Sequence, residues 1–335
     1  TSTVLCIDFG TSNTALGAYL DTNYVRDLPT NDILNGNIKI NEINYVKFND
    51  GERRYREILP TIAYVDDCSD ENNIKYSFGY DVVKKLEMND YIVNGSLFYG
   101  LKKWVHDHDE VEKINDEFGN IRFVERKEII KAYLKYIVKR AEYMFKCKFK
   151  KIHASSPVRL KEQFLNMFQE IFSIDVKDGK VTSKKYEYEI ITDNAMDEAI
   201  AVLYNTIENQ IKKERYIQGE EYSALIIDCG GGTTDLAACK YVIENGKISY
   251  KLDIKTSFEN GDENFGGNNL TYRLMQYLKV VLAEKYSENN EISVNDLIPY
   301  DNDMIYKVID EYGIEKIFEN LDREYEKSEK IIPTK

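Results

Sequence analysis

Two stretches of the sequence each carry an acid, glycine and hydroxyl side chains directly after an apolar run. The first is "VLCIDFGTSNTALGAYL", from Val4 to Leu20, and the second is "ALIIDCGGGTTDLAACKYV", from Ala224 to Val242. Glycine lets a phosphate group approach the backbone without meeting a Cβ, and the N–H groups and hydroxyls of such a turn can donate hydrogen bonds to it. The stretches therefore predict two phosphate-binding turns, which consist of Gly10, Thr11, Ser12 and Asn13 and of Gly230, Gly231, Gly232 and Thr233.

The acids of these stretches indicate a metal ion as well. Asp8 and Asp228 would repel a bound phosphate unless a cation lay between them, and Mg²⁺ is usually held by one or two carboxylates, water and phosphate oxygens. Both acids are therefore predicted to bind magnesium through water. Asp235, just after the second turn, is placed to orient an attacking water. A glycine-containing hairpin without a ligand would explain either stretch alone, but the repetition favours a nucleotide site.

The elements that must position these turns alternate between strands and helices. Neither G-x-G-x-x-G nor G-x-x-x-x-G-K-[ST] occurs at the turns, and strands rather than helices are expected after them, which argues against Rossmann and Walker sites. In the first half, the patterns predict a strand over residues 59–65, helices over 80–87 and 125–145, and a buried strand over 150–158.

In the second half, the patterns predict a helix over residues 195–211 and antiparallel strands over 235–252, joined by a turn at Asn245 and Gly246. A further helix is expected to start near the glycines before Asn268 and to continue through Lys285, with Leu270, Leu274, Leu278 and Val281 on one apolar face. The remaining residues are expected to be mostly helical and strongly charged.

Composition limits the classes of function. The chain has 335 residues, 43% of them apolar, and a formal net charge of −13. It is long enough for two lobes, since single cores rarely exceed roughly 250 to 300 residues. The acidic balance argues against a nucleic-acid partner, because such binding depends on clustered Lys and Arg. No run suits a membrane span and no secretion signal is present, so we expect a cytoplasmic protein with no membrane partner.

Cysteines and histidines indicate no metal centre. The five cysteines are widely spaced without a C-x-x-C pair, which favours reduced thiols over disulfides or zinc ligands. His106 and His108 stand among acids in "WVHDHDEVE", where a solvated charged loop explains them better than a metal site.

The two turns resemble the phosphate loops of the sugar-kinase, DnaK-type heat-shock chaperone (heat-shock protein 70) and actin superfamily, and the chaperone branch is the most similar. "LPTIAYV", "YSFGYDVVKKL" and "SLFYGLKKWV" are similar to its early Thr-Pro-Ser strand, Gly-x-x-Ala helix and catalytic-lysine segment. "IHASSPVRLKEQF", "ITDNAMDEAIAVLY" and "GDENFGGNNLTYRLM" resemble later segments, in the family's order. The resemblance covers nearly the whole chain.

The resemblance implies an α/β, two-lobed actin-like ATPase (ribonuclease H-like) fold, with mixed sheets flanked by helices and ATP with Mg²⁺ between the lobes. Lobe I would be residues 1–194, and lobe II residues 195–335, with the second phosphate loop in 220–275 and an incomplete adenine-side subdomain in 276–335. By this resemblance, Asp8 and Asp228 would bind magnesium through water, and Thr11 and Ser12 would bind phosphate. Thr233 and Asp235 would place the nucleophilic water, and Lys102 or Lys103 would contact phosphate. Cofactor binding is also expected of Gly266, Gly267, Glu326 and Lys330.

Alternatives remain for some of these roles. Lys102 and Lys103 could be solvated charges, and the charged segment of Glu326 and Lys330 could be a plain solvated helix. Asp193 and Asn194 stand where the family has Glu-Pro, so the acid that helps to arrange the water is shortened or absent. Asn268 replaces another family acid. The family's later adenosine motif and final helices have no counterpart before Lys335, which leads us to expect a fragment with an open adenine pocket.

The resemblance implies an ATP-binding, slowly hydrolysing domain of a DnaK-type chaperone-like protein, in which nucleotide state controls lobe closure. Its partners would be nucleotide and a protein client, a cochaperone or a further C-terminal domain. Three alternatives stay open: an actin-like filament-forming ATPase, a nucleotide sensor without turnover, and a small-molecule kinase of the same superfamily.

Overall fold

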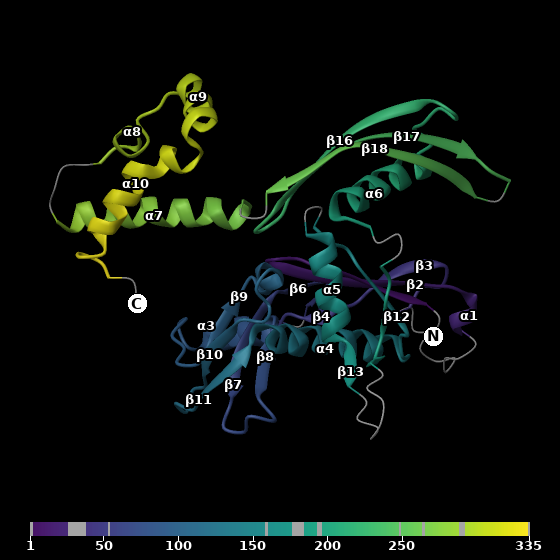
Figure 1. The fold of residues 1–335 in the computed structure, drawn as a ribbon, viewed down its shortest axis with the longest axis horizontal. Coiled ribbons are helices and arrows are strands. Elements are labelled where there is room, and N and C mark those ends of the chain that lie inside the picture. The colour runs from purple at the N-terminus through teal and green to yellow at the C-terminus, as the bar shows by residue number, and fades with distance from the viewer. Residues whose placement is uncertain are drawn as a thin grey trace. The chain divides into compact units, whose positions relative to one another are not determined.

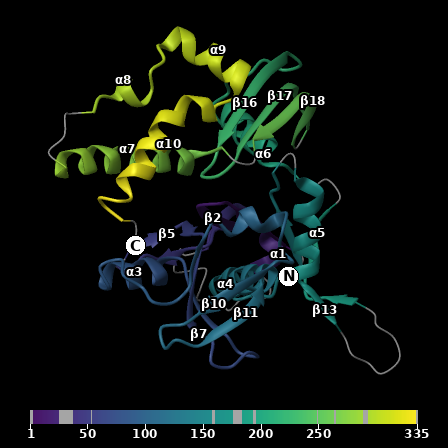
Figure 2. The same cartoon turned by 60° about the vertical axis from the view of Figure 1, so that its left-hand side comes forward.

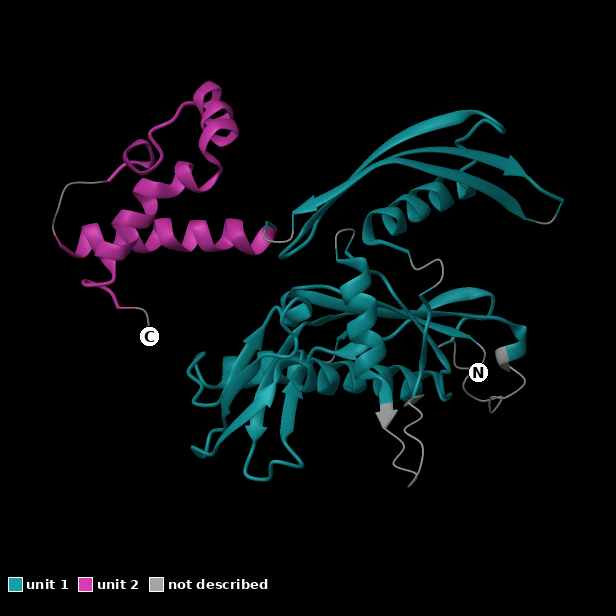
Figure 3. Cartoon of the chain, in the orientation of Figure 1, with its two compact units in different colours: residues 1–265 teal, residues 266–335 magenta. Residues whose placement is uncertain are grey.

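The structure is a computed structural model that describes residues 3–25, 38–52, 54–157, 160–175, 184–192, 196–247, 249–262, 265–287 and 292–333. The chain divides into two compact units, Thr1–Phe265 and Gly266–Lys335 (Figure 3). The fold is mixed α/β, with helices and several sheets, as predicted at that level. The predicted lobe boundary between residues 194 and 195 lies outside the described residues and stays a prediction.

The first hairpin forms the centre of a six-stranded sheet (Figure 1). β1 (Val4–Phe9) pairs antiparallel with β2 (Asn13–Leu20) and parallel with β12 (Lys151–Ala154). β15 (Glu189–Ile190) extends the sheet beyond β12, while β3 (Glu42–Tyr45) and β6 (Ile58–Pro60) both pair with β2. The strand–turn–strand reading of the first stretch is therefore confirmed.

Two helices cover one face of this sheet, because alternate residues of β1 point toward them. Leu5, Ile7 and Phe9 are fully or almost fully buried, and Phe9 packs against Tyr133 of α4 (Arg126–Phe145) and Phe164 of α5 (Lys161–Ile171). A helix repeats its side-chain direction about every 3.6 residues and a strand every 2 residues, so α4 and β1 each turn one apolar side toward the other. The predicted helix over 125–145 and the strand within 150–158 are confirmed.

The predicted strand over residues 59–65 is wrong as a single element. It is divided between β6, in the first sheet, and β7 (Ile62–Asp67), which pairs with β8 (Lys75–Phe78) and β9 (Leu97–Tyr99). The chain changes sheets at Thr61, whose N–H donates to the Ser12 carbonyl at 2.8 Å and whose hydroxyl lies 2.9 Å from that of Thr14.

The helix predicted over residues 80–87 is confirmed as α3 (Tyr80–Met88). The other short elements of this unit are α1 (Thr22–Val25), β4 (Phe48–Asn49), β5 (Tyr55–Arg56), the 3₁₀ helix η1 (Leu101–Val105), β10 (Val111–Asn115), β11 (Ile121–Glu125), β13 (Ser173–Asp175) and β14 (Lys184–Tyr186).

The second hairpin belongs to a three-stranded antiparallel sheet of β16 (Glu221–Cys229), β17 (Thr234–Asn245) and β18 (Tyr250–Asp262). The two strands are antiparallel as predicted, but the chain does not turn at Asn245: this residue ends β17 and pairs with Tyr250 of β18, and the Gly246 N–H donates to the Ser249 carbonyl at 2.8 Å. Figures 1 and 2 show α6 (Glu198–Lys212) against one face of this sheet, where its buried apolar side chains meet Ile226, Ala237 and Ile243. The first residue of the predicted helix, Ala195, lies outside the described residues.

The second unit is helical and consists of α7 (Gly267–Tyr286), α8 (Val294–Leu297), α9 (Asn302–Tyr312) and α10 (Glu315–Ser328). The helix predicted to end near Lys285 is confirmed, but its predicted apolar face is not the buried one. Leu270, Leu274 and Leu278 are 51–59% exposed, and the buried residues of α7 are Gln276, Val280 and Ala283. The reason is that α10 packs on the opposite face, where Asp322 accepts hydrogen bonds from Arg273 and Gln276.

Among the described residues, no helix combines the length and the apolar character that crossing a membrane requires.

Candidate functional site

The two hairpin turns share one backbone design. The Gly10 N–H donates to the Asn13 carbonyl at 3.1 Å, and the Gly230 N–H donates to the Thr233 carbonyl at 2.8 Å. Asp8 lies opposite Ala15 across the first hairpin, and Asp228 lies opposite Asp235 across the second. Asp8 and Asp228 therefore hold equivalent positions, while Asp235 is an additional acid of the second hairpin.

The turns lie in direct contact with each other. A Cβ on Gly231 would lie 2.0 Å from the Ser12 Oγ, and a Cβ on Gly232 would lie 2.7 Å from the Thr11 Cγ2 and the Lys103 Cε. Real Cβ atoms essentially never approach other heavy atoms so closely. Glycine at these two positions therefore lets the turns meet, whereas the sequence predicted that glycine makes room for phosphate.

A small cavity of about 100 Å³ lies beside the turns. Its lining includes the hydroxyl-bearing Thr11 and Thr233 and the side chains of Lys102, Lys103 and His106. Two ammonium groups and two hydroxyls in so small a space suit a tetrahedral anion. The residues predicted from the two turns and from the lysine segment are thus brought to one place.

The acids line a larger neighbouring cavity of about 570 Å³. Asp8 enters it from β1, Asp228 from β16 and Glu198 from the first turn of α6. The Ser155 Oγ donates to the Asp8 Oδ1 at 3.2 Å, which orients that carboxylate. Burial and the negative charge of Asp8 raise the pKa of Asp228, and the ammonium of Lys102 opposes this shift. The negative charge of Asp8 therefore makes the neighbouring carboxyl of Asp228 harder to ionise.

Glu198 is a site residue that the sequence reasoning missed. It forms an ion pair with Lys102, whose side chain is only 4% exposed, while that of Glu198 is 12% exposed. Burial, and after it the charges of Asp8 and Asp235, raises the pKa of Glu198 to about 7 against the pull of Lys102. An acid in the first turn of a helix is common at any helix start, so the sequence carried no specific signal for this role.

Local backbone contacts hold Glu198 in place. The Asp197 carboxylate caps α6 by accepting from the Ile200 N–H at 2.8 Å, and the Glu198 N–H donates to the Ser156 carbonyl at 3.1 Å. Because α6 packs on the second sheet while η1 packs in the core of the first, the ion pair of Glu198 with Lys102 connects the two halves of this unit.

The side chains present fit a divalent cation. Asp8, Asp228, Asp235 and Glu198 supply carboxylate oxygens, which Mg²⁺ prefers, against the single buried ammonium of Lys102. Neighbouring like charges are destabilising, and the negative charge of Asp8 raises the pKa of Asp228. A bound cation would relieve this repulsion.

The roles predicted for the residues of the second unit, and for Asn13, stay predictions. Gly266, Gly267, Glu326 and Lys330 belong to the second unit, where Glu326 and Lys330 are exposed and the Gly266 N–H donates to the Asn269 Oδ1 at 3.0 Å. Asn13 is exposed at the end of the first turn. Asp193 and Asn194, which the sequence resemblance aligns with a Glu-Pro pair, lie outside the described residues.

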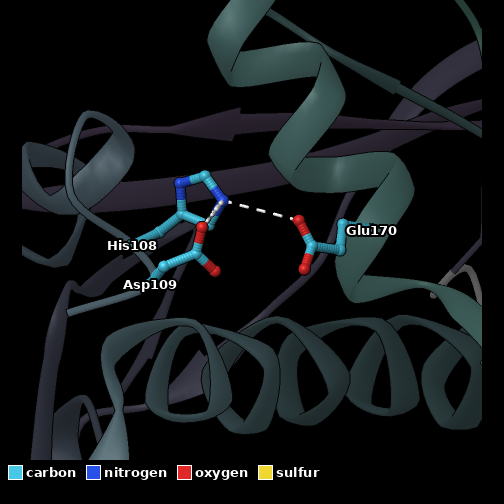
Figure 4. Close-up of side chains that lie close together, drawn as sticks. All are labelled: His108, Asp109 and Glu170. Carbon is cyan, nitrogen blue, oxygen red and sulfur yellow. Dashed lines mark ion pairs between the residues drawn. The ribbon is translucent and has the colours of Figure 1, made fainter. Parts of the chain in front are cut away.

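A second group of potential metal ligands comprises His108, Asp109 and Glu170 (Figure 4). The His108 Nε2 lies 3.8 Å from an Asp109 oxygen and 3.5 Å from a Glu170 oxygen. The Lys127 Nζ lies 2.6 Å from the Asp109 Oδ1 and 3.0 Å from the Glu170 Oε1, and these hydrogen bonds raise the pKa of Lys127. The lysine therefore supplies the positive charge here, and the group is an ion-pair network.

No protein-family model matches the chain, and none of the curated proteins matches its sequence.

Proposed function

We propose that this chain binds ATP with Mg²⁺ in an actin-like two-lobed arrangement and hydrolyses it slowly, as the nucleotide-binding domain of a DnaK-type chaperone-like protein. One observation carries the proposal: two hairpins of the same design bring their turns into contact, with Asp8, Asp228 and Lys102 beside them. The sequence resemblance to the phosphate loops of that superfamily supports it.

In this proposal, the small cavity beside Thr11 and Thr233 takes the terminal phosphate, with Lys102 and Lys103 offsetting its charge. Asp8 and Asp228 hold the magnesium ion, which supplies neutralisation of the phosphate oxygens when bound. Asp235 orients the water whose oxygen forms the new bond to phosphorus as the bond to ADP breaks. The proton that the water loses passes to a neighbouring carboxylate.

The ion pair of Lys102 and Glu198 gives this site a way to sense closure. Its two members come from elements that pack in different cores of the first unit, so a change in the spacing of these cores alters the pair. A client, a cochaperone or a further domain would read that change.

Calorimetric titration with ATP and ADP, with and without Mg²⁺, tests the proposal, together with a phosphate-release assay. We expect Mg-dependent binding, weakened about 10- to 100-fold by Asp8→Asn or Asp228→Asn. Asp253→Asn, which alters an exposed acid of β18, is the matched control. Unchanged Mg-ATP affinity in both site variants would sink the assignment, and binding without phosphate release would indicate a nucleotide sensor.

A further inference from the structure

A cavity of about 410 Å³ lies apart from the nucleotide site, beside the C-terminal end of α4. Its lining includes three cationic side chains, two tyrosine rings and a methionine, which are Lys47, Arg140, Lys146, Tyr55, Tyr143 and Met144. None of these residues lines either cavity of the nucleotide site.

The three cations lack acidic partners within the part of the chain that the structure describes. No Asp or Glu there forms an ion pair with Lys47, Arg140 or Lys146, although the chain contains 58 acids against 45 Lys and Arg. Arg140 and Lys47 are held together by a hydrogen bond from the Arg140 guanidinium to the Lys47 carbonyl at 3.4 Å. A local excess of positive charge on an acidic protein selects an anionic ligand.

The aromatic walls add an apolar surface to this charge. The Lys146 Nζ lies 3.9 Å from the centre of the Tyr143 ring, and the Arg140 guanidinium lies 5.9 Å from it. Met144 fixes the neighbouring backbone, since its Sδ accepts the Lys47 N–H at 3.3 Å. Because both cations lie over the Tyr143 ring, a ligand that binds here would meet positive charge and an aromatic surface together.

The backbone that places Lys146 is strained. Lys146 ends α4 in the left-handed conformation, with φ of 52°, where glycine is the usual residue. Such strain collects at functional positions because the surrounding structure must hold it.

We propose that this cavity binds an acidic peptide segment of a partner protein. One apolar or aromatic side chain of the segment would pack against Tyr143 and Met144, and its carboxylates would face Lys47, Arg140 and Lys146. Tyr55 and Tyr143 stay 64% and 66% exposed, so the site is a surface across which a chain can lie. Small-molecule pockets instead enclose most of their ligand.

Methionine methyl groups offer a direct test, because the chain has only six methionines. Met144 lines this cavity and Met196 lines the cavity of Asp8 and Asp228. With ¹³C-methyl methionine in the full chain, the peptide Asp-Glu-Phe-Asp-Glu at up to millimolar concentration is expected to shift the Met144 signal and leave Met196 in place. The Met196 signal is expected to shift when Mg-ATP is added. The peptide proposal and the ATP proposal are therefore read from two different signals, and either can fail without the other.

Charge variants complete the experiment. Arg140→Gln with Lys146→Gln is expected to weaken the peptide at least about tenfold, and high salt should weaken it further. Lys139→Gln with Lys150→Gln removes the same charge from exposed residues nearby and should have little effect. Three results would overturn the proposal: no Met144 shift, equal binding of Asn-Gln-Phe-Asn-Gln, or equal loss in both variants. A Met144 signal that moves with protein concentration alone would assign the surface to a second copy of this chain.

Discussion

Glu198→Gln is expected to stabilise the protein above neutral pH, although it removes the partner of the buried Lys102. Burial, Asp8 and Asp235 together outweigh Lys102 and raise the pKa of Glu198 from 4.5 to about 7. The folded protein therefore holds this proton more tightly than the unfolded chain does. Stability contributed by protonated Glu198 is lost as the pH rises from about 4.5 to about 7.

The magnitude follows from the size of the shift. One pKa unit corresponds to about 1.4 kcal/mol, so ionised Glu198 costs the folded state up to about 3 kcal/mol. Glutamine resembles the protonated acid and carries no charge. We therefore expect the free energy of unfolding of Glu198→Gln to exceed that of the wild type by up to about 3 kcal/mol near pH 8, and to equal it near pH 4.

Urea unfolding of the wild type and Glu198→Gln over this pH range measures the difference. Glu208→Gln is the matched control, because Glu208 lies on the same helix in an exposed pair with Lys212 and should change stability by less than about 1 kcal/mol. The reasoning fails if Glu198→Gln is less stable than the wild type near pH 8. A loss of about 3 to 5 kcal/mol would mean that the stranded charge of Lys102 dominates.

Three further predictions concern the proposed ATP site. Asp235→Asn is expected to slow phosphate release at least about 100-fold with little effect on Mg-ATP affinity; equal losses would remove its role in orienting water. Gly231→Ala should lower the midpoint of urea unfolding, because its Cβ would lie 2.0 Å from the Ser12 Oγ, and adding Ser12→Gly should restore it; absence of rescue would contradict the contact between the turns. Lys102→Gln should reduce ATP affinity more than Lys103→Gln, because Lys102 is buried beside the acids while Lys103 is exposed, and the reverse order would transfer the role to Lys103.

The sequence by itself determined the local elements of this protein. An Asp followed by glycine between alternating apolar residues specifies a hairpin within a few residues, and both hairpins are present. The long helix over residues 125–145 was predictable for the same reason, since helical preferences depend on near neighbours. The acids at equivalent positions of the two hairpins follow from these elements.

Only the tertiary structure decided which of these residues meet. The contact of Gly231 with Ser12 joins positions more than two hundred residues apart, and no local pattern encodes it. The choice of Lys102 over Lys103 as the buried lysine, and the selection of Glu198 as its partner, depend on how η1 and α6 pack. The apolar face of α7 was mispredicted for the same reason: periodicity marks a stripe, but burial depends on the element that packs against it, which here is α10.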